Sequence, residues 1–387
     1  IIMFSVISSG MVAVMTQNIG ADRPGVAYQA RQLGLAFNAV LGVIMSLFLS
    51  LGAGTILSGV GVADALMQPA KTYLQIVGGF CILNALIPIC SSYLRAFGFS
   101  KEPLYASIIG NVINFCLNAF FLFVLHKGVA GVATATVISR IINLVIVVLL
   151  GAVLVKAKQH PERESNRAVM GQIIRIGLPS ACETAIYNVS MTLVIRFLNQ
   201  MDAQGLNVTA RSYTMQITNF SYCVGAALAQ ANAIMTGWHI GAKEYDACDR
   251  GTKKAAVIGV IVAVILETVF TLCSGWIMQL FSKDPQMVSL VGKLLAIDIV
   301  LEIGRVTNLV YGQALKTSGD AVFPVVMGAC FMILCSVGGT YLFGIRLGLL
   351  AVGAYIGMTG DECVRAVGMY LRWKSGKWKE KGLVKSR

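Results

Sequence analysis

Long apolar runs separated by short polar stretches are the main pattern along this chain. The segments at 73–94 and 104–125 contain no charged residue. A helix needs roughly 20 mainly apolar residues to cross a bilayer, where only helices and closed barrels satisfy the backbone polar groups. The pattern therefore predicts an all-α polytopic membrane protein with eleven spanning helices, at residues 1–17, 33–55, 73–94, 104–125, 130–155, 171–195, 212–237, 255–280, 291–315, 323–344 and 348–371.

The two halves of the chain repeat each other. LRAFGFSKEP at 94–103 matches LKTSGDAVFP at 315–324, and NIGADRPGVA at 18–27 matches HIGAKEYDA at 239–247, all with an offset of 221 residues. A constant offset between several unrelated motifs indicates a tandem duplication.

The duplication also predicts the number of helices. The second copy opens near Gly171, so the first copy should open about 50 residues before Ile1, and we expect one further helix upstream. The expected fold is two pseudo-symmetric six-helix bundles, with eleven of the twelve helices present. An even number of helices gives both copies the same orientation, as in transporters with parallel repeats and a cavity between the halves.

Four regions are expected along the chain. Only 13% of the residues are charged and 56% are hydrophobic, whereas about a quarter of a soluble domain is charged, so most of the chain belongs to the bundles. The regions are an N-terminal bundle at 1–156 without its first helix, a cytoplasmic linker at 157–170, a C-terminal bundle at 171–371 and a basic cytoplasmic tail at 372–387.

The distribution of Lys and Arg predicts the orientation. The loops and tail on one side carry 21 of them, and the other side carries 7, Arg211 included. Because cytoplasmic loops are enriched in Lys and Arg, the C-terminal tail is predicted to be cytoplasmic in a cell membrane. The net charge of +13 then reflects topology and anionic lipid headgroups. Its spread over many short loops argues against nucleic acid. In the tail, Trp373 and Trp378 are either anchors at the headgroup surface or part of a solvated stop signal.

Cysteine and histidine patterns argue against several classes of enzyme. The ten cysteines are scattered without a CxxC motif, and the three histidines fall in predicted loops. A metal cluster, a disulfide framework or an intramembrane nucleophile is therefore not expected. We also find no phosphate-binding loop, so nothing supports direct coupling to ATP. We expect no enzyme activity and no cofactor.

Ionisable residues inside the predicted spans are the main functional candidates, because each costs roughly 2.5–3.5 kcal/mol on insertion scales. Glu302 and Arg305 are three residues apart, and Asp361 and Arg365 are four apart, so each pair shares a helix face. Such a pair is either a structural ion pair or a site that exchanges a proton or sodium ion for a cationic substrate. The full set is Arg140, Glu183, Glu267, Asp298, Glu302, Arg305, Asp361, Glu362 and Arg365.

Two further acids in the second half differ in what surrounds them. Pro179 precedes Glu183 by four residues, and a proline frees backbone carbonyls of the kind that transporters use in ion sites. A simple kink with a satisfied glutamate is the alternative. Glu267 has no partner that the sequence identifies.

Several segments occur in a specific order along nearly the whole chain. They are the paired turns at 94–103 and 315–324, QNIGADRPGVAYQAR, GWHIGAKEYDA, GLPSACE and EIGRVTNLVYGQALKTSGD. Together they resemble the multidrug and toxic compound extrusion (MATE) family of secondary transporters, and DECVRAVGMYLRWKSGKW resembles the closing helix of a bacterial subgroup. The resemblance implies two six-helix bundles, V-shaped around a central cavity, that export organic cations in exchange for sodium ions or protons.

The resemblance also suggests candidate ion sites. Many members carry an acidic residue in the first helix, which this chain lacks, and an Asn and an Asp four residues apart. Here the matching positions are Asn114 and Asn118, whose amide oxygens can coordinate sodium but cannot carry a proton. The favoured ion-coupling site is therefore Glu302 with Arg305, followed by Glu183.

The sequence thus predicts a monomeric cation-coupled antiporter that works by alternating access on small organic cations, surrounded by membrane lipids. The alternatives are a flippase for lipid-linked oligosaccharides, which should have a cavity lined by Arg and Lys, and a metabolite or anion exporter on the same scaffold. A channel is possible in principle. The predicted walls of the substrate cavity include Asp361, Glu362, Arg365, Tyr187 and Tyr222.

Overall fold

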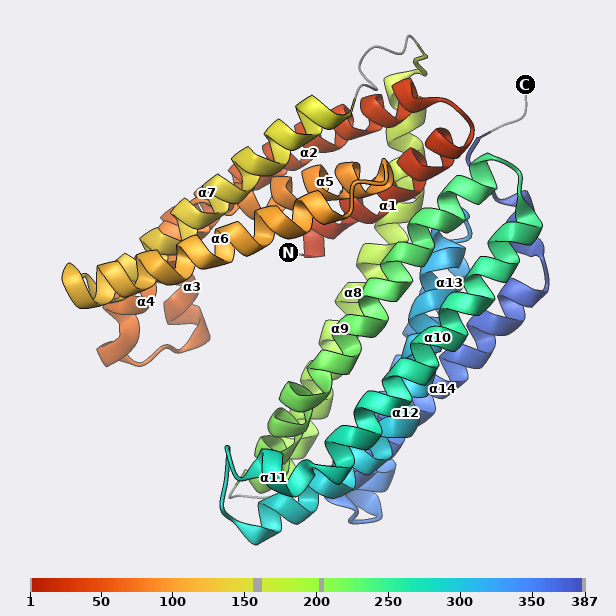
Figure 1. Ribbon diagram of the computed structural model, residues 1–387. Coiled ribbons are helices and arrows are strands. Elements are labelled where there is room, and N and C mark those ends of the chain that lie inside the picture. Colours follow the sequence, from red (N-terminus) through yellow and green to blue (C-terminus); the bar gives the residue numbers. More distant parts are fainter. Residues whose placement is uncertain (1, 156–161, 202–204, 385–387) are drawn as a thin grey trace. The chain divides into compact units, whose positions relative to one another are not determined.

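The computed structural model describes residues 2–155, 162–201 and 205–384. All regular structure in these ranges is helical (Figure 1). The chain divides into two compact units, Ile1–Gly177 and Leu178–Arg387. Residues 157–161 of the predicted linker and 385–387 of the predicted tail lie outside the described residues.

The first unit is built from seven helices and the start of an eighth. Helix α6 continues into a short π-helical segment, Phe120–Val124. The helices are α1 (Ile2–Gly20), α2 (Pro24–Leu51), α3 (Ala53–Val60), α4 (Asp64–Gly79), α5 (Ile82–Ala96), α6 (Lys101–Ala119), α7 (Gly128–Leu154) and the beginning of α8 (Asn166–Met201).

The second unit contains the rest of α8 and six more helices. Its penultimate span is α13 followed by two π-helical segments, Met332–Val337 and Thr340–Arg346. The helices are α9 (Leu206–Gly241), α10 (Tyr245–Leu272), α11 (Ser274–Met278), α12 (Pro285–Thr317), α13 (Val322–Phe331) and α14 (Leu350–Lys374).

Among the described residues, each of the eleven predicted spans falls mainly on helix, so the predicted fold class is confirmed. The segment at 73–94 was predicted as a single helix, but α4 and α5 meet there at a bend of 41°. Consecutive glycines, Gly78 and Gly79, end α4 at this point, and glycine weakens a helix. The segment at 33–55 is also split, because α2 ends at Leu51 and α3 follows.

Length and composition single out the purely apolar spans. Among the described residues, five helical segments are long and apolar enough to cross a membrane, and a sixth is if α4 and α5 form one span. Helices α12 and α14 are not among them because both carry several charged side chains. Helices α12 and α14, which are excluded by their charged residues, therefore carry most of the candidate functional residues.

The tandem repeat is visible in the backbone at its turns. Asp22 and Lys243 have positive φ angles of 56° and 61° at equivalent positions. Gly98 and Gly319 have φ angles of 88° and 97°, in the left-handed region that glycine adopts without steric cost. The motifs that revealed the duplication therefore form the same turns in both copies.

Two apolar clusters in the second unit enclose a charged layer. Along α12 the first cluster ends at Leu301 and the second begins at Val306, and along α14 the corresponding limits are Met358 and Met369. Glu302 and Arg305 of α12 and Asp361, Glu362 and Arg365 of α14 lie between these limits. The Leu294 cluster contains Val194, Leu198, Ala210, Ile217, Met278, Met287, Val291, Leu294, Leu295, Leu301, Ala351, Ala354, Tyr355 and Met358. The Val310 cluster contains Ala229, Ile240, Cys248, Ala256, Ala263, Val306, Val310, Tyr311, Ala314, Leu315, Met369, Trp373 and Trp378.

The C-terminal tail folds back onto the second unit. Trp373 and Trp378 stack with ring centroids 4.2 Å apart, and each ring is only 1% exposed. Trp373 Nε1 donates to Asp249 at 2.9 Å, and Trp378 Nε1 donates to the Trp373 carbonyl at 3.0 Å. The interpretation of these tryptophans as headgroup anchors or as part of a solvated signal is therefore wrong. Stacking and hydrogen bonding within the protein bury both rings.

The tail also covers the turn at Gly319. A Cβ built on Gly319 would lie 2.3 Å from the Lys381 carbonyl oxygen, whereas a Cβ on Gly98 would meet nothing within 4 Å. Both turns have the same backbone conformation. The difference between them is that only the turn at Gly319 contacts the tail at this position.

We predict that Gly319→Ala destabilises the protein more than Gly98→Ala. Both changes place an alanine in the left-handed region, at a cost of about 1–2 kcal/mol, but only Gly319→Ala also pushes the tail away. The measurement is the thermal unfolding midpoint in detergent micelles, together with the rate of trypsin cleavage after Lys381. Equal midpoints and equal cleavage rates in the two variants would contradict a packed tail.

Candidate functional site

Two adjoining cavities open beside the charged layer of the second unit. The first is lined by residues that include Arg211, Asp298 and Asp361, and the second by residues that include Glu183, Lys316 and Arg365. Four residues line both: Tyr187 from α8, Tyr222 from α9, Arg305 from α12 and Glu362 from α14. Four helices thus converge on one region.

Glycines bring the helices of this region close together. A Cβ on Gly304 of α12 would lie 2.8 Å from the backbone nitrogen of Cys363 on α14. Small residues permit such close backbone approach between membrane helices. Because Gly304 lies between Glu302 and Arg305, this contact places both side chains beside Glu362.

A second glycine contact positions the π-helical segment. A Cβ on Gly357 of α14 would lie 2.8 Å from the Cys335 carbonyl oxygen, so the segment lies directly against α14. Ser336 in this segment donates a hydrogen bond to Asp361 at 2.9 Å. The π-helical turn therefore supplies a neutral donor to a buried carboxylate.

The pairs predicted from helical spacing both form. Arg365 holds Asp361 through two hydrogen bonds, Nε to Oδ1 at 2.8 Å and Nη2 to Oδ2 at 3.0 Å. Arg305 pairs with Glu302. Arg365 Nη2 also reaches Glu362 at 3.0 Å, and Arg305 Nε lies 3.7 Å from the same carboxylate. Glu362 therefore joins the two predicted pairs into one network.

Glu183 has a partner that the sequence did not identify. Lys316 Nζ on α12 lies 2.5 Å from Glu183 Oε2, and both side chains are largely buried. Pro179 lies within the continuous helix α8. The role of Glu183 in ion coupling stays a prediction, but its charge is already balanced.

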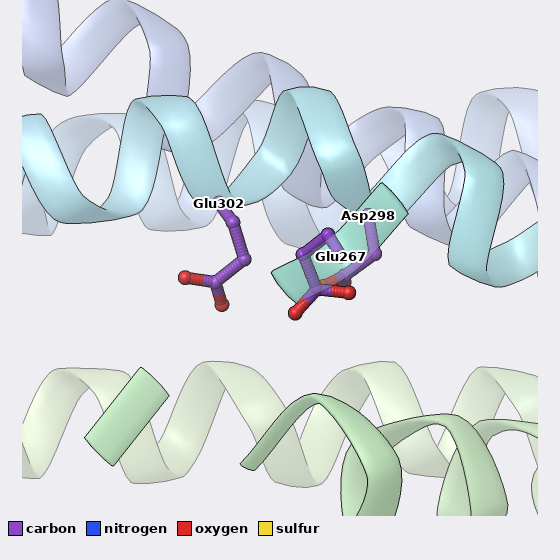
Figure 2. Close-up of side chains that lie close together, drawn as sticks. All are labelled: Glu267, Asp298 and Glu302. Atoms are coloured by element: carbon purple, nitrogen blue, oxygen red, sulfur yellow. The ribbon is translucent and has the colours of Figure 1, made fainter. Parts of the chain in front are cut away.

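Three carboxyl groups lie close together (Figure 2), and one of them, that of Asp298, lines the first cavity. Glu267 from α10 and Asp298 and Glu302 from α12 each offer an oxygen, and these oxygens all lie within 4.8 Å of one another. We call these three residues the three-acid cluster. Glu267 and Glu302 are fully buried, and Asp298 is 2% exposed. The network is thus more acidic on the side facing α10.

Sequence reasoning missed this cluster because its members come from two helices. Spacing along one helix relates Asp298 to Glu302, but it cannot connect either of them to Glu267. The sequence did contain one signal. Asp298 and Glu302 are four residues apart in α12, and two like charges at this spacing destabilise a helix. This spacing therefore required another residue nearby to offset the repulsion.

Arg211 is a further residue that the sequence placed wrongly. It was counted among loop residues, but α9 begins at Leu206. The Arg211 side chain is buried and lines the first cavity. Arg211 Nη2 lies 3.7 Å from Met191 Sδ. No ion pair of Arg211 is found in the described part of the chain.

The two asparagines of the first unit are brought together as predicted from their spacing. Asn118 Nδ2 donates to Asn114 Oδ1 at 3.0 Å, and Asn114 Nδ2 donates to Ser139 at 3.3 Å. The buried carbonyl oxygen of Asn118 has no hydrogen-bond partner among the described residues. An ion-coupling role for this pair stays a prediction.

The two tyrosines line the cavities as expected. Tyr187 and Tyr222 are 40% and 42% exposed, so their rings are accessible from the cavities they line. The Arg305 guanidinium lies 5.9 Å from the centroid of the Tyr222 ring, within the range of a cation–π contact. Their role in substrate binding is not yet tested.

Comparison with known proteins gives consistent matches. The family model MatE matches residues 1–120 and 179–342. The uncharacterized transporter YisQ of Bacillus subtilis is 32% identical over 390 residues, covering 99% of this chain and 85% of that protein. The probable multidrug resistance protein NorM of Thermotoga maritima is 22% identical over 362 residues, covering 88% of this chain and 76% of that protein.

The fold matches solved structures as well. A crystal structure of MATE in the bent conformation has a TM-score of 0.89 and 18% identity, covering 98% of this chain and 85% of that one. The helical architecture, the matching family model and a relative above 30% identity agree with one another. The chain belongs to the MATE family of multi-pass membrane transporters.

Proposed function

We propose that this protein is a cation-coupled antiporter that exports organic cations across the cell membrane by alternating access. The observation that carries the proposal is a pair of cavities whose walls combine two tyrosine rings with buried carboxylates. The protein is proposed to act as a monomer among membrane lipids, with its C-terminal tail in the cytoplasm.

The balance of charge in the site favours a cationic substrate. The described residues of the cavity walls and the three-acid cluster include five carboxylates, at Glu267, Asp298, Glu302, Asp361 and Glu362, and three guanidiniums. The Glu183 and Lys316 pair adds no net charge. An excess of acid attracts cations and opposes the flippase alternative, which requires a basic cavity.

The remaining wall of the first cavity suits substrates of varied shape. Met191, Met215 and Met358 line it together with the tyrosines. Methionine side chains are flexible and polarizable, and adapt to irregular partners. Aromatic rings attract organic cations through their negative faces. The lining therefore fits amphipathic cations as a class.

Arg305 can couple the binding of a proton or sodium ion to the release of an organic cation. It contacts Glu302 on one side and Glu362 on the other. A proton or sodium ion on Glu302 would neutralise that carboxylate and leave Arg305 to pair with Glu362. The cavity would then be less negative, and a bound organic cation would be held more weakly. Such competition gives each ligand a different affinity for the two states.

An anion exporter is the second candidate function. Arg211 lines the first cavity, its Nε has no hydrogen-bond partner among the described residues, and a buried guanidinium without a carboxylate can bind an anionic group. The acidic surroundings make this reading the weaker one.

We predict that Glu302→Gln slows gradient-driven export at least about tenfold. The measurement is ethidium movement in proteoliposomes under an imposed sodium gradient or an imposed pH gradient. Asp246→Asn, an exposed change on α10, serves as the control and should transport normally. Export at the wild-type rate in Glu302→Gln would remove this residue from the coupling role.

We also predict that Arg365→Leu lowers stability by about 3–5 kcal/mol, because it leaves a buried carboxylate without its partner. The double variant Arg365→Leu with Asp361→Asn should recover much of this loss. Arg346→Leu, at an exposed arginine, is the control. Thermal unfolding in micelles measures all of these variants, and a double variant as unstable as Arg365→Leu would show that the pair is not the cause.

A further inference from the structure

We infer that Arg211 binds an anionic group of the substrate, so that the first cavity selects molecules that carry a carboxylate as well as a cationic group. The inference rests on the proposed function and deepens it, because it names a specificity-determining residue of the same site. It assigns a role to Arg211, which the sequence had placed in a loop.

Arg211 lies at one end of the wall that α9 contributes to the first cavity. That wall consists of Arg211, Met215, Thr218, Asn219 and Tyr222. Residues spaced three or four apart lie on one face of a helix. At a rise of about 1.5 Å per residue, Arg211 and Tyr222 are roughly 16 Å apart along the helix axis. The cavity therefore follows α9 over about three turns.

The Tyr222 end of this wall adjoins the charged layer. The Arg305 guanidinium lies 5.9 Å from the centroid of the Tyr222 ring. Both residues line the second cavity as well, and so does Glu362. A cationic group held by the Tyr222 ring and the Glu362 carboxylate would therefore lie several helical turns from the start of the wall at Arg211.

The Arg211 guanidinium forms no ion pair with a described residue. The residue is only 6% exposed, its Nε has no hydrogen-bond partner among the described residues, and its Nη2 lies 3.7 Å from the sulfur of Met191. Asn207, one turn earlier on α9, uses its side-chain oxygen to accept from the Ala351 backbone nitrogen at 3.0 Å. A buried charge without a partner is costly, so Arg211 calls for an anionic partner from outside the chain.

The other guanidiniums in the cavity walls already have such partners. Arg365 holds Asp361 through two hydrogen bonds, and Arg305 pairs with Glu302. A guanidinium presents a planar fork of donors that matches a carboxylate. Among the described residues that line the two cavities, Arg211 is the arginine whose fork holds no carboxylate.

A molecule with both charges suits this cavity better than one with a single charge. A simple anion would be repelled by Asp298, Asp361 and Glu362, which line the same cavity. A simple cation would leave Arg211 without a partner. An elongated molecule with its cationic group near Tyr222 and a carboxylate at Arg211 would neutralise both ends.

The remaining walls suit the body of such a molecule. Tyr187, Met191 and Met215 line the first cavity, and flat aromatic or flexible thioether side chains pack against aromatic groups. The first and second cavities have volumes of about 210 and 340 Å³. Because they adjoin, they reach the size of sites for drug-sized ligands, roughly 300–1,000 Å³.

The test compares two fluorescent dyes that differ at one carboxyl group. Rhodamine 110 carries a free carboxylate beside its cationic ring system, and rhodamine 123 is the methyl ester of the same molecule. Fluorescence anisotropy measures the affinity of the purified protein for each dye in detergent micelles. Arg211→Met should lower the preference for rhodamine 110 over rhodamine 123 at least about tenfold, because it removes a charge-assisted hydrogen bond to the carboxylate alone.

Two further variants act as controls. Arg211→Lys keeps the charge but loses the planar fork, so it should retain part of the preference. Arg196→Met removes an exposed arginine of α8 that lines neither cavity, and it should behave as the wild type does. Without dye, Arg211→Met should unfold at the wild-type temperature or above it, because the change removes an unpaired buried charge.

Three results would overturn the inference. The first is an unchanged dye preference in Arg211→Met, and the second is an equal loss of affinity for both dyes. The third is a wild type that binds neither dye saturably. Thermal unfolding in sodium chloride and in sodium gluconate separates a free anion from a substrate group. If chloride stabilised the wild type but not Arg211→Met, and the dye preference stayed the same, Arg211 would hold a free anion instead.

These outcomes are distinct from failure of the proposed antiport. Gradient-driven export of rhodamine 123, by a protein whose dye preference does not depend on Arg211, would remove this binding role and leave the antiporter. The expected change in preference without any gradient-driven export would do the reverse.

Discussion

The need to pair buried charge organises the second unit. Several charged side chains of α12 and α14 lie between the Leu294 cluster and the Val310 cluster, and a charge that is buried there without a partner is costly. Arg365 neutralises the charge of Asp361 through two hydrogen bonds, and Arg305 forms an ion pair with Glu302. The apolar clusters on either side hold α12 and α14 in place. The paired side chains are therefore fixed in the positions from which they line the cavities.

Pairing in this layer is incomplete. A buried ion pair contributes little net stability compared with an apolar core, so a full set of pairs would add little beyond structure. Here neither carboxyl oxygen of Glu267 has a hydrogen-bond partner among the described residues. The fold is shared with solved MATE transporters at 18% identity, but function depends on individual side chains placed on that fold.

The sequence predicted those features that depend on one helix at a time. The spans follow from apolar runs, and the Glu302–Arg305 and Asp361–Arg365 pairs follow from helical periodicity. Features that join two helices could not be found this way: Lys316 reaches Glu183 from another helix, and Glu267 meets Asp298 across α10 and α12. Arg211 and the two tail tryptophans were misplaced for a related reason. A helix can extend beyond its apolar segment, as α9 does at Arg211. A polar chain segment such as the tail can also be buried by packing that its composition does not reveal.

The two equivalent turns of the duplication have acquired different surroundings. Gly98 has open space where a side chain would be, whereas Gly319 is closed in by the carbonyl of Lys381. The two turns therefore differ in the substitutions that they can accept: a side chain at the first turn meets open space, whereas one at the second turn would have to displace the Lys381 carbonyl.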